Sequence, residues 1–176
     1  LCEAVILENP SLPAPHYLLG TIRGLQDKLD QAIDYLERAK TLAPNHVAIN
    51  VNLATLLRRA GKVKDAYDLL SSQELLIELD IDALSLKANL QLELGEHEAA
   101  VETATRALLQ RKDCVAAIVA KANALAALRH DEEALSLYSE AIALDPSPQL
   151  KINKARVLQE FGKLQDALKI YDAVLN

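Results

Sequence analysis

The histidines and cysteines are the residues of this 176-residue chain that could hold a metal ion or act as nucleophiles. They are His16, His46, His97 and His130, with Cys2 and Cys114. No HExxH segment, CxxC pair or pair of histidines on one helix face is present, and zinc sites need such spacings. The serine and cysteine side chains lack a neighbouring base, and no Gly-rich phosphate loop occurs. We therefore predict a chain that is not an enzyme and has no catalytic residues, metal site or cofactor.

The composition favours closely packed helices and argues against nucleic acid as a partner. Apolar residues make up 51% of the chain but aromatic residues only 3%, with 5 glycines and 6 prolines. Such an Ala- and Leu-rich chain favours helices that pack through small residues. The net charge is −6, and the basic residues form only short clusters, such as Arg58-Arg59 and Arg111-Lys112. We therefore expect no nucleic-acid binding, and no apolar run is long enough to span a membrane.

The two cysteines and the first residue indicate a cellular compartment and a fragment of a longer protein. Two isolated cysteines do not form a disulfide framework, which favours a reducing compartment such as the cytoplasm. A periplasmic location is also compatible if a signal lies upstream. Because the chain starts at Leu1 rather than at a methionine, we interpret it as a fragment of a longer protein.

Small residues recur along the chain at an interval of 34 residues. One series is Gly20, Ala54, Ala88, Ala122 and Ala155, and a second is Ala32, Ala66, Ala100, Ala134 and Ala167. In both series the spacings are 34, 34, 34 and 33. The same period explains why GKVKDA at 61–66 nearly recurs as GKLQDA at 162–167. A fixed interval of this length is typical of repeat arrays built from helix pairs.

Each period contains two helical segments separated by a turn. In the fourth period, residues 116–128 predict an apolar first helix, and apolar residues recur at i, i+3, i+4 and i+7 in residues 133–144. Pro146 predicts the end of that second helix. The glycines between helices, where a left-handed residue can end the first one, are Gly61, Gly95 and Gly162.

This pattern resembles the tetratricopeptide repeat (TPR) family, whose 34-residue unit has small residues at positions 8 and 20. The resemblance implies an all-α fold, a right-handed α-solenoid of antiparallel helix pairs forming a TPR superhelix. The implied repeats are residues 13–46, 47–80, 81–114, 115–147 and 148–176, with 1–12 as the end of a preceding repeat. The small residues let two helix backbones approach closely.

The second implied repeat matches the pattern least well. It has Gln73 at position 27 and Glu78 at position 32, where the family has Ala and Pro. The polar segment Ser71-Ser72-Gln73 predicts a shortened or distorted second helix. Whether this irregularity serves a function is open at this point.

In TPR proteins the first helices line a concave groove that binds peptides, so the resemblance implies partner-binding residues on them. These are Tyr17, Thr21, Val51, Asn52, Thr55, Arg59, Ser85, Asn89, Val119, Asn123, Ile152 and Arg156. The first repeat also offers Gly24 and Leu25 to the groove. The mixture of small, apolar and isolated polar side chains suits an extended or helical peptide. Stacked amides of Asn89 and Asn123 could hold a peptide backbone, or could be solvated or satisfy local turns.

A carboxylate clamp of the kind that holds the Hsp70 or Hsp90 carboxy-terminus is not expected. In three consecutive repeats the clamp has Lys and Asn, then Asn, then Lys and Lys or Arg. The first three repeats supply only Asn52 of that set, and the last three supply only Asn89. Without the cations, a bound carboxylate would be unpaired.

Three functions remain in competition. We favour a non-catalytic scaffold that binds a protein or peptide in the groove. An alternative is a homo-oligomer formed through the terminal helices, because the last helix has Ala167, Ile170, Tyr171 and Val174 on one face and no capping helix after it. The third is a substrate-docking module of an enzyme encoded outside this fragment.

Overall fold

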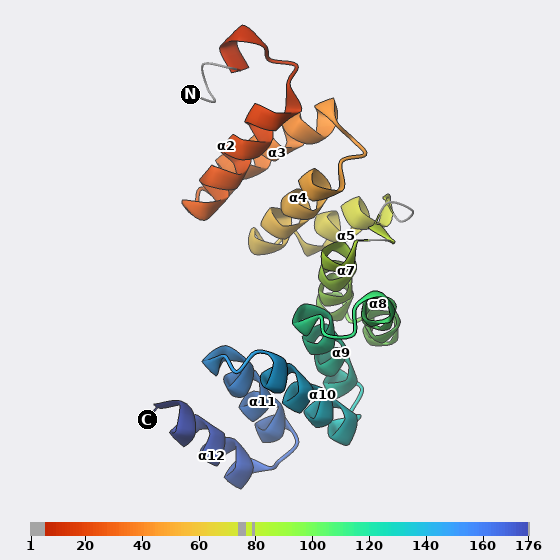
Figure 1. The fold of residues 1–176 in the computed structure, drawn as a ribbon, viewed down its shortest axis with the longest axis vertical. Coiled ribbons are helices and arrows are strands. Elements are labelled where there is room, and N and C mark those ends of the chain that lie inside the picture. Colours follow the sequence, from red (N-terminus) through yellow and green to blue (C-terminus); the bar gives the residue numbers. More distant parts are fainter. Residues whose placement is uncertain (1–5, 74–76, 79, 176) are drawn as a thin grey trace. The chain divides into compact units, whose positions relative to one another are not determined.

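The computed structural model describes residues 6–73, 77–78 and 80–175, which contain helices and no strand (Figure 1). The chain divides into two compact units, with the boundary between Leu90 and Gln91. Within each unit the helices form antiparallel pairs. The predicted all-α fold is therefore confirmed.

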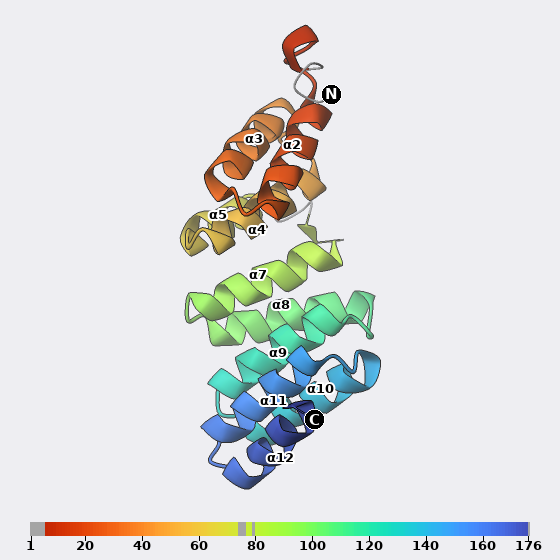
Figure 2. The ribbon, with the colours of Figure 1, turned by 90° about the vertical axis from the view of Figure 1, so that its left-hand side faces the viewer.

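In the first unit, successive helices alternate in direction and lie side by side (Figure 2). They are α2 (Pro13–Leu25), α3 (Leu29–Leu42), α4 (Val47–Arg59), α5 (Val63–Ser71) and the start of α7 (Ile81–Glu93). α2 packs on α3, α3 on α4, and α4 on α5. The second helix of the first pair, α3, therefore lies against the first helix of the next pair, α4. At the start of α7, the Asp80 carboxylate accepts a 2.8 Å hydrogen bond from the Ala83 N–H.

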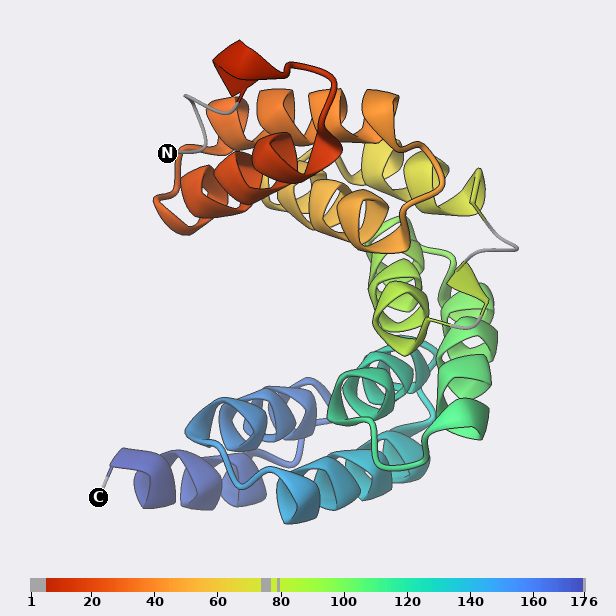
Figure 3. The same cartoon turned by 45° about the horizontal axis from the view of Figure 1, so that its top comes forward.

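The second unit repeats this arrangement, and Figure 3 shows its last two pairs from another side. Its helices after the end of α7 are α8 (His97–Gln110), α9 (Val115–Ala127), α10 (Asp131–Leu144), α11 (Pro148–Glu160) and α12 (Leu164–Leu175). α8 packs on α9, α9 on α10, α10 on α11, and α11 on α12. The helices predicted over 116–128 and 133–144 are thus confirmed as α9 and α10.

The small residues of the two series lie where helices meet. Ala54, Ala122 and Ala155 are 0% exposed, as are Ala32 and Ala66. At Gly20, an added Cβ atom would lie 2.7 Å from Leu36 Cγ and 3.1 Å from the Ala32 carbonyl oxygen. Those distances are shorter than van der Waals contact, so α2 and α3 approach closely because residue 20 has no side chain.

The turn after each first helix uses one hydrogen-bond pattern. After α4, the Lys62 N–H donates to the Leu57 carbonyl at 2.9 Å, and the Gly61 N–H donates to Arg58 at 3.0 Å. This is a Schellman motif, in which a left-handed residue ends the helix. The left-handed residues are Asp27, Gly61, Gly95, Arg129 and Gly162, with φ of 60°, 76°, 81°, 64° and 77°. The role predicted for the glycines is confirmed, and Asp27 and Arg129 adopt it without being glycine.

The second helix of the second pair is short, as the polar segment 71–73 predicts. α5 ends at Ser71 after 9 residues, whereas α3, α8 and α10 each have 14. The Ser72 hydroxyl donates to the Leu69 carbonyl at 2.7 Å, which satisfies an acceptor at the end of the helix. Ile77 is 1% exposed and belongs to the core of the first unit, so the chain returns to the core soon after α5 ends.

Candidate partner-binding surface

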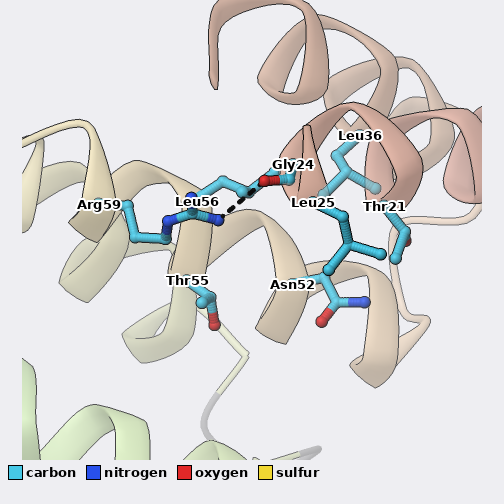
Figure 4. Close-up of a pocket in the computed structure, with 8 residues that line it drawn as sticks. All are labelled: Thr21, Gly24, Leu25, Leu36, Asn52, Thr55, Leu56 and Arg59. Carbon is cyan, nitrogen blue, oxygen red and sulfur yellow. Dashed lines mark hydrogen bonds between the residues drawn. The ribbon is translucent and has the colours of Figure 1, made fainter. Parts of the chain in front are cut away.

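A hollow of about 140 Å³ lies between α2 and α4 in the first unit (Figure 4). We call it the α2–α4 hollow. Its lining residues are Thr21, Gly24, Leu25, Leu36, Asn52, Thr55, Leu56 and Arg59. Thr21, Asn52, Thr55 and Arg59 are among the residues implied to bind a partner, so successive first helices bring part of the implied set to one place.

Leucine side chains and a glycine make the floor of the α2–α4 hollow apolar. Leu36 is fully buried and Leu56 is 6% exposed, while Leu25 at the edge is 84% exposed. A Cβ atom on Gly24 would lie 2.9 Å from Leu56 Cδ2. The absence of a side chain at Gly24 therefore lets α4 approach α2 at the base of the hollow.

Hydroxyl and amide groups form the rim of the hollow. Asn52 Nδ2 donates to the Tyr17 hydroxyl at 2.7 Å, which connects α4 to α2. The Thr21 and Thr55 hydroxyls donate to carbonyls one turn earlier in their own helices, at 2.9 and 2.8 Å. Thr55 is exposed, and Thr21, Asn52 and Tyr17 are half-buried. Each hydroxyl oxygen keeps the capacity to accept a hydrogen bond from a partner.

Arg59 provides the positive charge at the hollow. Its Nη1 donates to the Gly24 carbonyl at 3.1 Å, and its Nη2 donates to Asp27 Oδ1 at 2.9 Å. The Arg59 side chain is 45% exposed and that of Asp27 is 83% exposed. Arg59 therefore satisfies a carbonyl at the end of α2 while it stays accessible to a ligand.

The remaining implied residues Val51, Ser85 and Asn89 do not line the hollow. Val51 is half-buried and packs against the hydrophobic core. On α7, Ser85 is 3% exposed and its hydroxyl donates to the Ile81 carbonyl at 2.7 Å. Asn89 is half-buried, and its Nδ2 donates to the Ser85 carbonyl at 2.9 Å. Neither Ser85 nor Asn89 is among the lining residues of the α2–α4 hollow, so the candidate site does not include them.

In the second unit, Asn123 accepts a hydrogen bond from the hydroxyl of Tyr138. Tyr138 on α10 is 0% exposed. Burial raises the pKa of Tyr138 to about 12, with the Arg156 charge lowering it and the Glu160 charge raising it by smaller amounts. The half-buried Asn123 amide therefore accepts a hydrogen bond from a fully buried side chain.

The other implied residues of the second unit lie on α9 and α11. Val119 is half-buried and packs against core residues that include Ile118 and Leu150. Ile152 is half-buried, and Arg156 is exposed, with its Nη1 3.6 Å from Glu160 Oε1.

The sequence interpretation missed part of the hollow. Leu36 and Leu56 line the hollow but are not among the residues implied to bind a partner. Asp27 was missed because nothing in the sequence shows that a carboxylate in this turn meets Arg59. The signal available in the sequence was Asp27 itself, an acidic residue at a turn position where other repeats have glycine.

The described residues contain no group of three or more His, Cys, Asp or Glu side chains that could hold a metal ion. His16 is 4% exposed, and its Nε2 lies 3.1 Å from the Pro10 carbonyl oxygen. Cys114 is buried, and Cys2 lies outside the described residues. None of the helices in the described part of the chain has the length and apolar character that crossing a membrane requires.

Comparison with protein families identifies the fold. A family model described as a tetratricopeptide repeat matches residues 25–90, and a second with the same description matches residues 85–149. The chain belongs to the tetratricopeptide-repeat family. TPR arrays are typically protein-interaction modules that use the surface of their stacked helices. Comparison with curated proteins found no match.

Solved TPR structures share the fold at low sequence identity. A TPR protein from Parabacteroides merdae gives a TM-score of 0.88 at 20% identity, covering 99% of this chain and 70% of that one. A thermophilic TPR protein from Thermus thermophilus gives 0.83 at 18% identity, covering 93% and 90%. YrrB, described as a TPR protein with an unusual peptide-binding site, gives 0.70 at 16% identity, covering 99% and 90%. At these identities the likeness shows the fold alone.

Proposed function

We propose that this TPR chain is a non-catalytic scaffold that binds a segment of a partner protein on its first helices, at the α2–α4 hollow. The carrying observation is that side chains from two successive first helices line one hollow with an apolar floor and a polar rim. Binding sites of this kind bury an apolar group and orient it through a few polar contacts. YrrB, with the same fold, is described as having a peptide-binding site, which supports a peptide as the ligand.

The rim suits a peptide in an extended conformation. The exposed Thr55 hydroxyl can accept a hydrogen bond from a backbone N–H, since it already donates to the Val51 carbonyl. The Asn52 amide donates to Tyr17, and Asn52 and Thr21 both line the hollow (Figure 4). Backbone contacts of this sort give affinity without reading sequence, so specificity comes from the side chain that enters the hollow.

This proposal is tested by filling the hollow with a neutral side chain. Thr55→Tyr places a phenol ring at the rim and blocks it without adding charge. Thr41→Tyr is the matched control, because Thr41 is also exposed and donates to a carbonyl one turn earlier, at 2.9 Å, but lies on the second helix α3. Partners are captured from the native cell extract with cross-linking, and circular dichroism confirms that each variant is folded.

We expect wild type and Thr41→Tyr to capture the same partner and Thr55→Tyr to lose it. A partner that still binds folded Thr55→Tyr would place binding elsewhere and contradict the proposal. The division into repeats at residues 13, 47, 81, 115 and 148 belongs to the same proposal, since it defines which helices are first helices.

Self-association is the second candidate, and an exposed stripe on α12 favours it. Leu164, Leu168 and Leu175 are 62%, 57% and 85% exposed. Of the face expected to be open, Ala167 is 3% exposed, and Ile170 and Tyr171 pack against the core cluster that it forms with α11 residues, so the exposed stripe differs from the expected one. Leu135, at the position on α10 that corresponds to Leu168, is half-buried against α9 and α11 residues. Light scattering of wild type and of Leu164→Lys with Leu168→Lys tests this: a monomer in both cases would exclude it. That the array docks substrates for an enzyme domain outside this sequence stays a hypothesis, which the flanking sequence of the parent gene would test.

A further inference from the structure

The size of the α2–α4 hollow limits what can enter it. Its volume is about 140 Å³, and its floor is formed by Leu36, Leu56 and Gly24. An apolar protein cavity of about 150 Å³ accepts one benzene molecule. One Leu, Ile or Phe side chain of a ligand therefore fits, and a longer apolar segment does not. An apolar group that enters is removed from water on the side of the floor, which favours binding.

The positive charge of Arg59 at the hollow favours a ligand that has an acidic residue near the apolar side chain. The Gly24 carbonyl holds the Arg59 guanidinium at the rim through a 3.1 Å hydrogen bond. Its other described partner is Asp27, whose side chain is 83% exposed. An ion pair this exposed contributes little to stability, so a ligand carboxylate can replace Asp27 at small cost. A guanidinium also has further N–H groups with which to bind a carboxylate in a two-pronged geometry.

We propose that the hollow recognises a protein segment in which a large apolar residue, Leu, Ile or Phe, lies two positions from Asp or Glu, because side chains two residues apart share one face of an extended peptide. The apolar side chain occupies the hollow, and the neighbouring carboxylate pairs with Arg59. This inference rests on the proposed function and adds the chemistry of the ligand. Asp27 then acts as an internal competitor, which occupies Arg59 in the free protein.

Because Asp27 competes with the ligand carboxylate for Arg59, a variant that removes the Asp27 charge should strengthen binding. Asp27→Asn removes the competing charge, and Asn readily adopts the left-handed backbone that residue 27 has, with φ of 60°. Arg59→Gln removes the guanidinium. Arg58→Gln is the matched control, because it removes the same charge from the neighbouring position of α4, which does not line the hollow.

The probe is a phage-displayed library of random peptides, selected against wild-type protein, with the enriched peptides then synthesised. We expect the enriched peptides to share Leu, Ile or Phe two positions from Asp or Glu. Arg59→Gln should weaken their binding roughly fivefold or more, and Asp27→Asn should strengthen it roughly threefold, as exposed charge pairs allow. Arg58→Gln should change it less than about twofold, and added salt should weaken wild-type binding.

The outcomes separate this inference from the proposed function. Enriched peptides that lack acidic residues, or whose affinity is the same for Arg59→Gln and wild type, would overturn the inference and leave peptide binding at the hollow intact. Peptides that bind Thr55→Tyr as well as wild type would overturn both. Circular dichroism of each variant shows that lost binding is not lost folding.

Discussion

The buried hydroxyl of Tyr138 makes the stability of the second unit depend on alkaline pH in a predictable direction. The Tyr138 side chain is 0% exposed, and its hydroxyl donates to Asn123. Burial raises the pKa of Tyr138 from 10.0 to about 12. Because the folded-state pKa lies above the unfolded value, the folded protein keeps a proton that the unfolded chain loses. The resulting stability is complete below pH 10 and is lost as the pH rises through 12.

The magnitude follows from the shift and from the hydrogen bond. A difference of roughly two pKa units corresponds to about 3 kcal/mol of unfolding free energy. Tyr138→Phe removes the titration together with the hydrogen bond to Asn123, at a cost of about 1 kcal/mol. At about pH 8 the variant should therefore be less stable than wild type by about 1 kcal/mol. Near pH 12, where most of the Tyr138 stabilisation is lost, it should be more stable than wild type by about 1 kcal/mol.

Urea unfolding followed by far-ultraviolet circular dichroism, repeated from about pH 8 to pH 12, measures this crossover. Tyr171→Phe is the control for the general effect of losing a phenol, since it removes a hydroxyl at the corresponding position of α12. Parallel stability profiles for wild type and Tyr138→Phe across this range would refute the assignment of a buried, protonated phenol.

The packing and the turns give the remaining predictions. Ala100→Leu enlarges a side chain that is 0% exposed, so it should lower the unfolding free energy by about 1–3 kcal/mol, measured by urea titration, and an unchanged midpoint would contradict the close-contact role of that position. Gly61→Ala forces a Cβ atom into a left-handed turn with φ of 76°, and should cost about 1 kcal/mol in the same assay although space is open around it. Asp27→Gly relieves the equivalent turn and should raise the melting temperature, and a lower one would show that the Arg59 contact outweighs backbone strain.

The repeat period predicted the parts of the fold that depend on local chemistry. Small residues at fixed intervals, such as Ala54 and Ala66, indicated where helices meet, and both are fully buried. Gly61 indicated a left-handed helix end, because a glycine there avoids the steric cost of a Cβ atom. The polar segment after Leu70 indicated the early end of α5. Each of these inferences needs only a few neighbouring residues.

The candidate site was predictable only in part, because a hollow depends on distances between helices. The repeat positions of Thr21, Asn52, Thr55 and Arg59 assigned them to one set, and these four residues do line one hollow, while their role in binding stays a prediction. The Arg59–Asp27 contact spans 32 residues and depends on Asp27 adopting a left-handed backbone, which no periodicity indicates. Asn123 looked like a surface amide, and its bond to the buried Tyr138 became visible only with the packing of α9 on α10.

Arginines that reach the end of a neighbouring first helix have a consequence for how the array comes apart. Arg59, from the second pair, donates to the Gly24 carbonyl at the end of α2, and Arg129, in the turn after α9, donates to the Glu160 carbonyl at the end of α11 at 3.2 Å. Arg129 also lies over the Phe161 ring at 4.9 Å. At each of these two places a carbonyl at the end of one first helix accepts a hydrogen bond from an arginine of an adjacent pair. A pair isolated on its own loses that hydrogen bond as well as a packing face. Local opening measured by amide hydrogen exchange should therefore spread between the two helix pairs that each arginine connects. Replacing either arginine should make those two pairs open independently.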